Sequence, residues 1–246
     1  MEPGEYDTLA RLEGQHWWYV GMRRIAVKLL RSLSLRSPIK ILDAGCGVGG
    51  GLKWLASFGA TTGIDLNPSA VRYAARVSGR VAQSSIQSLP FPAEVFDLVT
   101  SFEVLYHLAV SNDEAALCEC ARVLKPGGWM LVRVPAYDWL RGAHDIQVHT
   151  RHRYAGRELR QKMERAGLIV CRLTHVGLAL LPVAILRRSI QSIQPVNEAH
   201  TDVTMPPAIF NKLLMIMLSA EGAWLRHFDF PFGLSLLALA RKLPES

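Results

Sequence analysis

The sequence predicts an α/β fold built on a mainly parallel sheet with helices on both faces. Short apolar runs typical of buried strands alternate with helical patterns over residues 39–174. The first run, residues 39–42, ends in an acid and is followed by five glycines within seven residues. That order of strand, tight turn and helix is typical of parallel α/β units. The length of 246 residues suffices for one such domain with insertions.

The segment before the first strand, residues 1–35, carries a dense aromatic cluster. Residues 16–19 read His-Trp-Trp-Tyr, and Arg23 and Arg24 follow on an amphipathic helical pattern. One interpretation is a helix packed on the sheet, with aromatic rings filling its edge. The other is an N-terminal helical and aromatic lid that covers a ligand and whose arginines meet a carboxylate. On the second interpretation, Tyr19 and Arg23 contact the ligand.

The glycine-rich stretch after the first strand predicts a site for a nucleoside-containing cofactor. Glycine allows the backbone to adopt positive φ and to approach a ligand closely, and the following helix offers free N–H groups. A second strand, residues 61–64, ends in Asp65, which lies 20 residues beyond Gly45. An acid at that distance is suited to binding the hydroxyl groups of a ribose.

The alternation of strands and helices continues along the chain. Asn67 is placed to cap the next helix, and Pro68 to be its first residue. Further expected elements are a helix to about residue 77, strands near 80–82 and at 96–102, a helix at 113–124, a sharp turn at 125–128, a strand at 129–134, a helix at 156–167 and strands at 168–174 and 234–240.

Two apolar stretches, residues 176–188 and 209–225, separate the last two predicted strands. Both are expected to be helices, joined by a flexible connection over 189–206, and no apolar run reaches the roughly 18 residues that a membrane span requires. Core or dimer packing is one interpretation, and an apolar surface that docks on a membrane or encloses an apolar ligand is the other. The predicted divisions are a lid at 1–35, a cofactor-binding core at 36–176, a helical insertion at 177–233 and a final strand at 234–246.

The net charge limits the kinds of partner that the protein can bind, and the cysteines indicate its cellular compartment. The formal net charge is +7 and the pI is near 9.5, which favours an anionic partner, although a merely basic soluble protein fits equally well. The four cysteines lack metal-ligand spacing, so no metal site is expected. Reduced thiols and the lack of a basic-then-apolar signal pattern favour a cytoplasmic location, with a peripheral position at a membrane surface as the alternative.

Five motifs occur within residues 38–135. They are D-x-G-x-G-x-G at 43–49, G-I-D at 63–65, S-L-P-F at 88–91, F-D-L-V at 96–99 and L-K-P-G-G at 124–128. In order and spacing they resemble the motifs of class I S-adenosylmethionine-dependent methyltransferases, and the set is far more specific than any single motif. The resemblance implies a Rossmann-like sheet of seven strands, whose last strand is antiparallel and lies beside the fifth.

The resemblance also implies that S-adenosyl-L-methionine is the cofactor and S-adenosyl-L-homocysteine the product. In that family the acid at the position of Asp65 binds the ribose hydroxyls, the glycine loop passes the methionine and ribose portions, and residues after the third strand frame the adenine. The implied cofactor-binding residues are Asp43, Gly45, Cys46, Gly47, Asp65, Leu66, Ser85, Ile86 and Phe102, with Tyr19 and Arg23 from the lid. Relatives commonly carry aspartate at the position of Ser85, and a serine hydroxyl accepts the same hydrogen bond more weakly.

The segment after the fifth strand resembles a bacterial subgroup of the same family. It begins with Pro-Ala at 135–136 and carries a His-Asp…His…Arg-Tyr pattern over 144–154. The subgroup also tends to carry the His-Trp-Trp-aromatic…Arg-Arg pattern found at residues 16–24. This loop leaves the carboxyl end of a parallel strand, which is the edge at which α/β sheets bind ligands.

Histidines on this loop are candidates for acid–base chemistry, since histidine exchanges protons near neutral pH. The predicted catalytic residues are His144, His149 and the orienting residue Tyr154, with His107 and Glu103 after the fourth strand as second choices. The alternative for any one histidine is a structural role, in which charged residues of the loop pair with neighbours and brace it.

The predicted function is methyl transfer from S-adenosylmethionine to a small-molecule or lipid-like acceptor, anionic in view of the charge. The Leu-Pro-Phe and Lys-Pro-Gly-Gly signatures argue against a nicotinamide dehydrogenase. Nucleic-acid methylation is permitted by the charge, but the Asn/Asp-Pro-Pro-aromatic signature common in amino-methylating enzymes is replaced by Phe-Glu-Val-Leu at 102–105. The alternative outside the enzymes is a cofactor-binding scaffold or membrane-associated partner.

Overall fold

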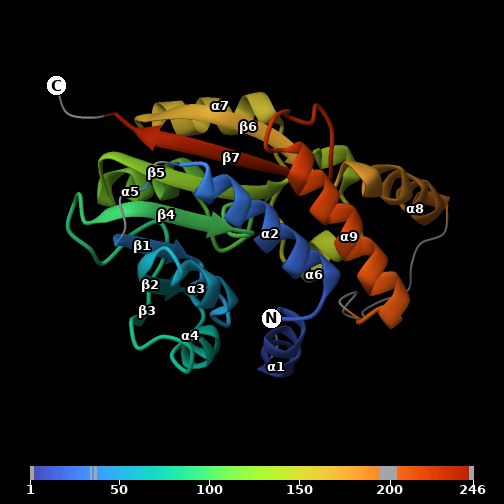
Figure 1. The fold of residues 1–246 in the computed structure, drawn as a ribbon, viewed down its shortest axis with the longest axis horizontal. Coiled ribbons are helices and arrows are strands. Elements are labelled where there is room, and N and C mark those ends of the chain that lie inside the picture. Colours follow the sequence, from blue (N-terminus) through green and yellow to red (C-terminus); the bar gives the residue numbers. More distant parts are fainter. Residues whose placement is uncertain (1–2, 34, 36–37, 194–203, 244–246) are drawn as a thin grey trace.

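A seven-stranded sheet forms the centre of the computed structural model (Figure 1). The structure describes residues 3–33, 35, 38–193 and 204–243, without the side chains of 3–5, 143–144 and 190–193. The strands are β1 (Ile39–Ala44), β2 (Gly59–Asp65), β3 (Val81–Gln83), β4 (Phe96–Phe102), β5 (Leu124–Pro135), β6 (Leu168–Val176) and β7 (Ser235–Lys242). Their order across the sheet is β3-β2-β1-β4-β5-β7-β6.

The strand pairing confirms the predicted Rossmann-like arrangement. The strands β1 to β5 pair in parallel, whereas β7 lies between β5 and β6 and is antiparallel to both. Parallel strands end at a common edge of a sheet. The carboxyl ends of β1, β2 and β4 therefore bring Asp43, Asp65 and Phe102 to one edge.

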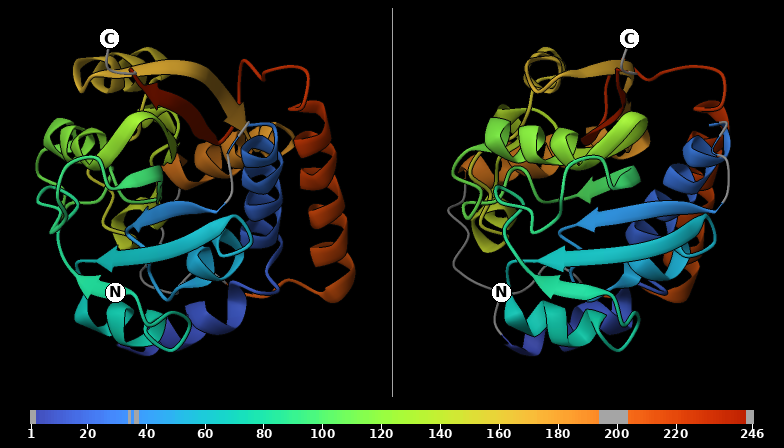
Figure 2. Two further views of the ribbon diagram at one scale, coloured as in Figure 1. Left: turned by 60° about the vertical axis from the view of Figure 1, so that its left-hand side comes forward. Right: turned by 90° about the vertical axis from the view of Figure 1, so that its left-hand side faces the viewer.

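Helices cover both faces of the sheet (Figures 1 and 2). They are α1 (Pro3–Leu12), α2 (Trp17–Arg31), α3 (Gly50–Leu55), α4 (Pro68–Ala74), α5 (Asp113–Val123), α6 (Ala143–Gln147), α7 (Gly156–Arg165), α8 (Leu181–Ile193) and α9 (Ala208–Trp224), with short 3-10 turns η1 (Asp138–Leu140) and η2 (Leu178–Leu180). Because side chains alternate between the faces of a strand, successive residues pack against the helices on opposite faces of the sheet. Leu98 and Leu131 pack in the layer of α2 and α9, whereas Val99 and Met130 pack in the layer of α5 and α7.

The fifth strand begins earlier than the sequence predicts. The sharp turn expected at 125–128 lies inside β5, because Phe96 pairs with Leu124 and Leu98 pairs with Trp129. The residues between these two pairs bulge from the ladder, and Gly127 there has a φ of 75°. The expected turn is therefore a bulge, since pairing resumes on its far side.

Helix α1 has no counterpart in the sequence-based prediction, and α8 extends to Ile193, into the stretch predicted as a connection. The remainder of that stretch at 194–203 lies outside the described residues. Helix α1 is held by tertiary packing, since Tyr6 packs with Val48 of the glycine loop and Ala70 of α4. A ten-residue helix stabilised in this way leaves little signal in its own sequence.

Helix α2 packs on the sheet and lies side by side with α9 (Figures 1 and 2). Its buried residues include Met22, Ile25 and Leu29. A Cβ on Gly21 would lie 2.3 Å from Cδ1 of Leu218 on α9, so the two helices touch at this point. The N-terminal segment therefore has the helical packing of the first interpretation. Its action as a lid, and the predicted divisions of the chain, stay predictions.

Candidate functional site

The glycine loop after β1 has the backbone conformation that the sequence predicts. Gly45, Gly47 and Gly49 have φ angles of 91°, 55° and 95°. The N–H groups of Gly45 and Cys46 both donate to the carbonyl oxygen of Ile64 at 2.8 Å, which joins the loop to β2. Glycine adopts these angles without strain and carries no Cβ, so a ligand can approach the backbone closely.

Asp65, at the end of β2, is bonded to the glycine loop. Its Oδ2 accepts the N–H of Gly47 and its Oδ1 accepts the N–H of Asn67, both at 2.9 Å. Burial raises the pKa of Asp65, and the two N–H groups oppose that rise. An ionised carboxylate offers about four acceptor positions, so two remain for the hydroxyl groups of a ligand. The next residue, Leu66, is half exposed beside it.

Asp43, at the end of β1, supports the loop from within the protein. Its side chain is 3% exposed and accepts the hydroxyl of Thr100 at 2.7 Å. Burial raises its pKa to about 6, and the Thr100 bond opposes that rise. A Cβ on Gly51 would lie 2.2 Å from Oδ2, so the carboxylate faces the start of α3. The buried thiol of Cys46 has a pKa raised by burial, which makes it unreactive.

Glu13 lies against the glycine loop, and the sequence analysis does not single it out. The N–H of Gly50 donates to its carboxylate, and a Cβ on Gly50 would lie 1.9 Å from Oε2. Burial raises the pKa of Glu13 to about 7, and the charge of Asp43 adds to the rise. Glu13 follows α1 in the chain, and no motif surrounds it. Only the packing of α1 beside the loop brings this acid to the site.

The segment predicted to frame adenine begins beside Asp65. The N–H of Ser84 donates to the carbonyl oxygen of Asp65 at 3.0 Å. The Ser85 hydroxyl oxygen accepts the N–H of Gln87 at 3.2 Å, and Ile86 is buried. The structure thus brings the predicted adenine and ribose residues together at the ends of β2 and β3.

A second polar cluster lies where β4 and β5 end. Arg133 is 8% exposed and its Nε donates to Oε1 of Glu103 at 2.7 Å. Its guanidinium lies 5.3 Å from the ring of Phe102. Glu103 has a φ of 61°, a strained angle for a residue other than glycine, and accepts a bond from Tyr106. Arginine is rarely buried, so an arginine within an otherwise apolar strand is a sequence signal that could have identified Arg133 as a candidate site residue.

Tyr19, near the start of α2, is influenced by the charges of both polar clusters. Burial raises its pKa to about 12, and the charges of Glu13 and Glu103 add to the rise. Arg23 lies one helical turn further along α2 and is partly exposed. The two tryptophans of the aromatic cluster pack in the layer of α2 and α9.

The loop between β5 and α7 is braced by an internal ion pair. Arg153 makes a two-pronged contact with Asp145, at 2.8 and 3.0 Å. Burial would raise the pKa of Asp145, but the bonds from Arg153 and from the N–H of Gly142 hold it below its usual value. The loop also pairs with the segment after β4, since Leu108 donates to the carbonyl oxygen of His149 at 2.8 Å. The two segments expected to bear acid–base residues therefore lie together.

His149 and His107 are neighbours in this arrangement. Their rings are 5.6 Å apart and nearly perpendicular. His149 is exposed and has a φ of 53°, which marks backbone strain. Nδ1 of His107 accepts the N–H of Ala109 at 3.1 Å, so its neutral ring carries the proton on Nε2. Burial and His149 lower the pKa of His107, and Asp65 opposes that decrease.

The other two predicted catalytic residues have different surroundings. Tyr154 is fully buried, and its hydroxyl donates to Oδ2 of Asp113 at 2.5 Å. Burial, followed by this bond, raises the pKa of Tyr154 well above its usual value. The backbone of His144 lies in α6, and its side chain is outside the described part of the structure. The catalytic roles predicted for these residues stay predictions.

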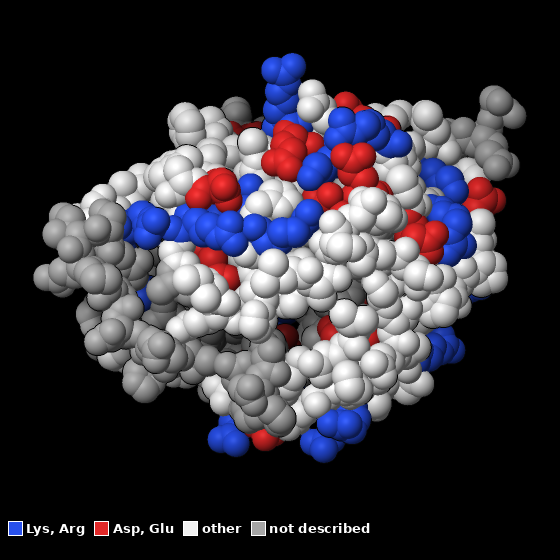
Figure 3. Space-filling model, turned by 180° about the vertical axis from the view of Figure 1, so that it is seen from behind, with Lys and Arg blue, Asp and Glu red and all other residues white. Residues whose placement is uncertain are grey.

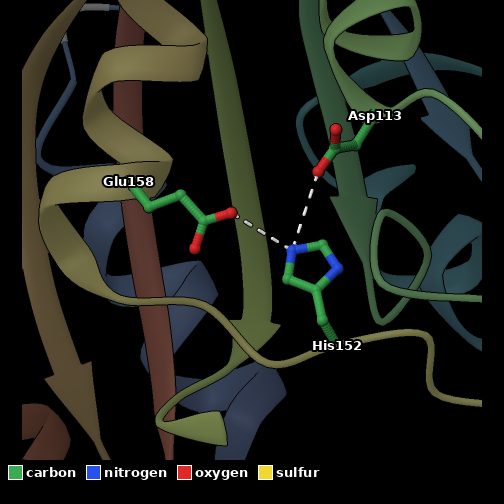
Figure 4. A group of neighbouring side chains, drawn as sticks. All are labelled: Asp113, His152 and Glu158. Atoms are coloured by element: carbon green, nitrogen blue, oxygen red, sulfur yellow. Dashed lines mark ion pairs between the residues drawn. The ribbon is translucent and has the colours of Figure 1, made fainter.

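Asp113, His152 and Glu158 form a group with the chemistry to hold a metal ion (Figure 4). Nε2 of His152 lies 3.8 Å from Oδ2 of Asp113 and 3.3 Å from Oε1 of Glu158. However, Nζ of Lys162 lies 2.7 Å from the same oxygen of Asp113 and 2.8 Å from that of Glu158. The ammonium group therefore already supplies the positive charge that these carboxylates attract.

The face of the molecule opposite to that of Figure 1 is hollowed near its centre (Figure 3). Acidic atoms are visible inside the hollow, and a row of basic side chains crosses the surface beside it (Figure 3). Basic and acidic groups are interspersed around the row, so this face does not present an unbroken positive surface.

Residues 42–132 match the family model described as a methyltransferase domain. The chain is 35% identical over 130 residues to the demethylmenaquinone methyltransferase of Tropheryma whipplei (strain Twist), covering 51% of this chain and 50% of that protein. It is 34% identical over 142 residues to the fatty-acid O-methyltransferase of Mycolicibacterium smegmatis, covering 52% of this chain and 51% of that protein. The chain thus spans about half the length of the curated relatives it matches.

Solved structures show the same fold. A chain in the complex of the Haloferax volcanii Trm112 methyltransferase activator with a methyltransferase aligns with a TM-score of 0.64 and 20% identity, covering 99% of this chain and 96% of that chain. The Haemonchus contortus phosphoethanolamine N-methyltransferase 2 in complex with S-adenosyl-L-methionine aligns with a TM-score of 0.59 and 17% identity, covering 91% and 53%. The [4+2]-cyclase SpnF has a TM-score of 0.58 and 21% identity, covering 91% and 82%.

Proposed function

We propose that this protein transfers a methyl group from S-adenosylmethionine to a small-molecule or lipid-like acceptor. The grounds are the match of residues 42–132 to the methyltransferase domain and the relatives, which support a class I S-adenosylmethionine-dependent enzyme. The observation that carries the proposal is the junction of Asp65 with the glycine loop, within the matched domain. The relatives named for demethylmenaquinone and fatty-acid methylation support the lipid-like class of acceptor. The net charge of +7 supports an anionic acceptor.

The residues at the ends of β1, β2 and β3 fit S-adenosylmethionine. Asp65 would accept the ribose hydroxyls with its remaining lone pairs, and Ser85 and Ile86 would border the adenine. Gly45 and Gly47, which lack side chains, would lie along the ribose and methionine portions. The cofactor, when bound, supplies a methyl group on a positively charged sulfur. The protein's own contribution is then to bind, orient and exclude water.

Glu13 would serve the amino-acid end of the cofactor. Its carboxylate is fixed at the loop by the N–H of Gly50, and burial makes it sensitive to a nearby positive charge. An ammonium group beside Glu13 would lower the pKa of the acid and gain a charge-assisted hydrogen bond. This role requires no movement of the glycine loop.

On the acceptor side, His149 is the proposed base. It is exposed, and its ring neighbours that of His107. Because the neutral ring of His107 has its proton on Nε2, that nitrogen is suited to donate a hydrogen bond. His144 stays a second proposed base, whereas Tyr154 would act by holding the loop against Asp113. Glu103 and Arg133 would then bind polar groups of the acceptor.

Two other functions remain as alternatives with weaker support. The mixed charges beside the hollow in Figure 3 do not favour a nucleic-acid backbone as partner. A non-catalytic scaffold is compatible with the fold alone, since a fold does not determine function.

A transfer assay with tritiated S-adenosylmethionine on a cell extract tests the proposal. The extract is separated afterwards into lipid, small-molecule, RNA and protein fractions. We expect label in the lipid or small-molecule fraction with the wild-type protein and none above background with Asp65→Ala. Label confined to RNA or protein would contradict the proposed acceptor class. Cofactor binding without label in any fraction would favour the scaffold.

A further inference from the structure

Helix α9 buries two polar residues, Asn211 and Glu221, and exposes a row of large apolar side chains to solvent. Positions at helical spacing along its outer face are Ile209, Leu213, Ile216, Ala220 and Trp224. The large members of this set are 54–72% exposed. We call these five residues the α9 stripe. A surface helix of a globular protein ordinarily has the opposite arrangement, so the α9 stripe calls for a partner.

The two polar residues on the inner face of α9 make specific bonds to the rest of the protein, beside the buried apolar Leu218. Asn211 accepts the N–H of Trp17 at 2.8 Å and donates to the carbonyl oxygen of Gln15 at 2.9 Å. The carboxylate of Glu221 accepts the N–H groups of Gly177 and Ala179, at 2.8 and 2.9 Å. These bonds fix the rotation of α9 about its axis. The α9 stripe therefore faces outward because these bonds hold the opposite side of the helix against the protein.

Among the described residues of helices α2, α8 and α9, nearly all charged groups are basic. Helices α2, α8 and α9 together carry seven basic residues, which are Arg23, Arg24, Lys28, Arg31, Arg187, Arg188 and Lys212. Their single acidic residue, Glu221, is buried and bonded as described above. Arg24 and Lys28 both donate to Ser219, so these two cations lie along the edge of α9, and Lys212 lies on α9 itself.

We propose that the α9 stripe docks on the surface of an anionic phospholipid bilayer. An apolar stripe bordered by Lys and Arg is the arrangement of helices that lie in the membrane interface. The basic border attracts the negative surface of such a bilayer, whereas two copies of this chain would bring like charges together. None of the described helices is long and apolar enough to cross a membrane. In this proposal α9 lies in the plane of the interface, with the α9 stripe toward the lipid.

The geometry places the cofactor site near that surface. In the left view of Figure 2, α9 lies at the edge of the molecule, farther from the strands than α2. The start of α2 is bonded to α9 through Asn211, and Tyr19 of the site lies less than one helical turn further along α2. The docking itself does not depend on methyl transfer, since the α9 stripe and Lys212 lie outside the site.

Vesicle flotation tests the docking. The purified full chain is mixed with vesicles of phosphatidylcholine alone or of phosphatidylcholine with phosphatidylglycerol. We expect wild-type protein to float with the anionic vesicles and to be released by salt. The double variant Leu213→Gln/Ile216→Gln should lose at least about tenfold in partitioning, since two apolar side chains no longer enter the interface. The matched double variant Ile169→Gln/Leu243→Gln, at exposed apolar residues elsewhere, should partition as wild type.

The basic border is tested separately. Lys212→Gln should weaken binding to anionic vesicles about fivefold, and Lys40→Gln, an exposed base on β1, should leave it unchanged. Circular dichroism and cofactor calorimetry on each variant establish that the fold persists, so loss of docking and loss of the proposed function are distinguishable. Failure of the wild type to float overturns the proposal. So does equal flotation of the stripe variant, or a wild-type dimer that Leu213→Gln/Ile216→Gln converts to monomer.

Discussion

Asp65 and Gly47 are joined by a 2.9 Å hydrogen bond from the backbone N–H of the glycine to the carboxylate. The bond ties the end of β2 to the loop after β1, so the two halves of the proposed cofactor site form one unit. Because the loop holds one carboxylate oxygen, the orientation of the acid is set by the fold.

Asp65→Ala should weaken S-adenosylmethionine binding by a factor of about 10 to 100 or more. Removing the carboxylate leaves the ribose hydroxyls without their acceptor, at a loss of about 1–3 kcal/mol. Isothermal titration calorimetry measures the change. Asp229→Ala, at an exposed acid paired with Arg172, is the matched control and should bind as wild type. Wild-type affinity in Asp65→Ala would refute the cofactor assignment.

His149→Ala should bind S-adenosylmethionine normally and lose about 10²- to 10⁴-fold in turnover once an acceptor is known. A base acts only when neutral, so the wild-type rate should fall on the acid side and the variant should lack that fall. His144→Ala tests the second candidate in the same way. His227→Ala, an exposed histidine after α9, is the control. Unchanged turnover in both loop variants would mean that the loop has only a structural role. The candidates for the general base would then be His107 and Glu103.

The contribution of Glu13 to the stability of the protein should fall as the pH rises from about 4.5 to 7. Burial raises the pKa of Glu13 from 4.5 to about 7, so the folded state binds more protons than the unfolded state between these values. Stability therefore decreases with rising pH across that window, by about 1–3 kcal/mol for this group. Asp43, with a pKa raised to about 6, contributes in the same direction.

Urea unfolding of Glu13→Gln at both ends of the window isolates this contribution. The variant should lose less stability than the wild type between the two pH values, because it lacks the Glu13 carboxyl group. Glu164→Gln, at an exposed acid on α7, should follow the wild type. A pH dependence in Glu13→Gln as steep as that of the wild type would be inconsistent with a buried Glu13.

Tyr154→Phe should lower the free energy of unfolding by about 1–3 kcal/mol. The buried Asp113 carboxylate loses its hydroxyl donor and keeps Lys162 and Arg151 as partners. Cofactor affinity should stay unchanged, because neither Tyr154 nor Asp113 is among the residues proposed to bind the cofactor. Tyr73→Phe, which removes an exposed hydroxyl bonded to Asp7, is the matched control. Equal stability of the two variants would mean that the bond to Asp113 does not brace the loop.

Much of the fold could be predicted from local patterns. The strand predicted at 96–102 agrees with β4 at both ends, because its apolar run is bounded by sharp changes in residue type. The positive φ angles of the glycine loop could be predicted because glycine adopts them without strain. The antiparallel final strand followed from the resemblance of the motifs, and periodicity alone would not have given it.

The features that escaped prediction depend on contacts between distant segments. Glu13 reaches the site only because α1 packs beside the glycine loop through Tyr6. The partner of Tyr154 lies 41 positions away, at the start of α5, so no spacing rule connects the two. The bonds of Asn211 to the start of α2 are likewise invisible in sequence, and they decide which face of α9 is turned outward.

The close approach of Gly21 to Leu218 has a mechanical consequence. With no side chain between the backbone of α2 and Leu218, the two helices cannot slide past each other without a clash. A methyl group at position 21 would meet Leu218 at 2.3 Å, so Gly21→Ala would have to push α2 and α9 apart at their point of contact.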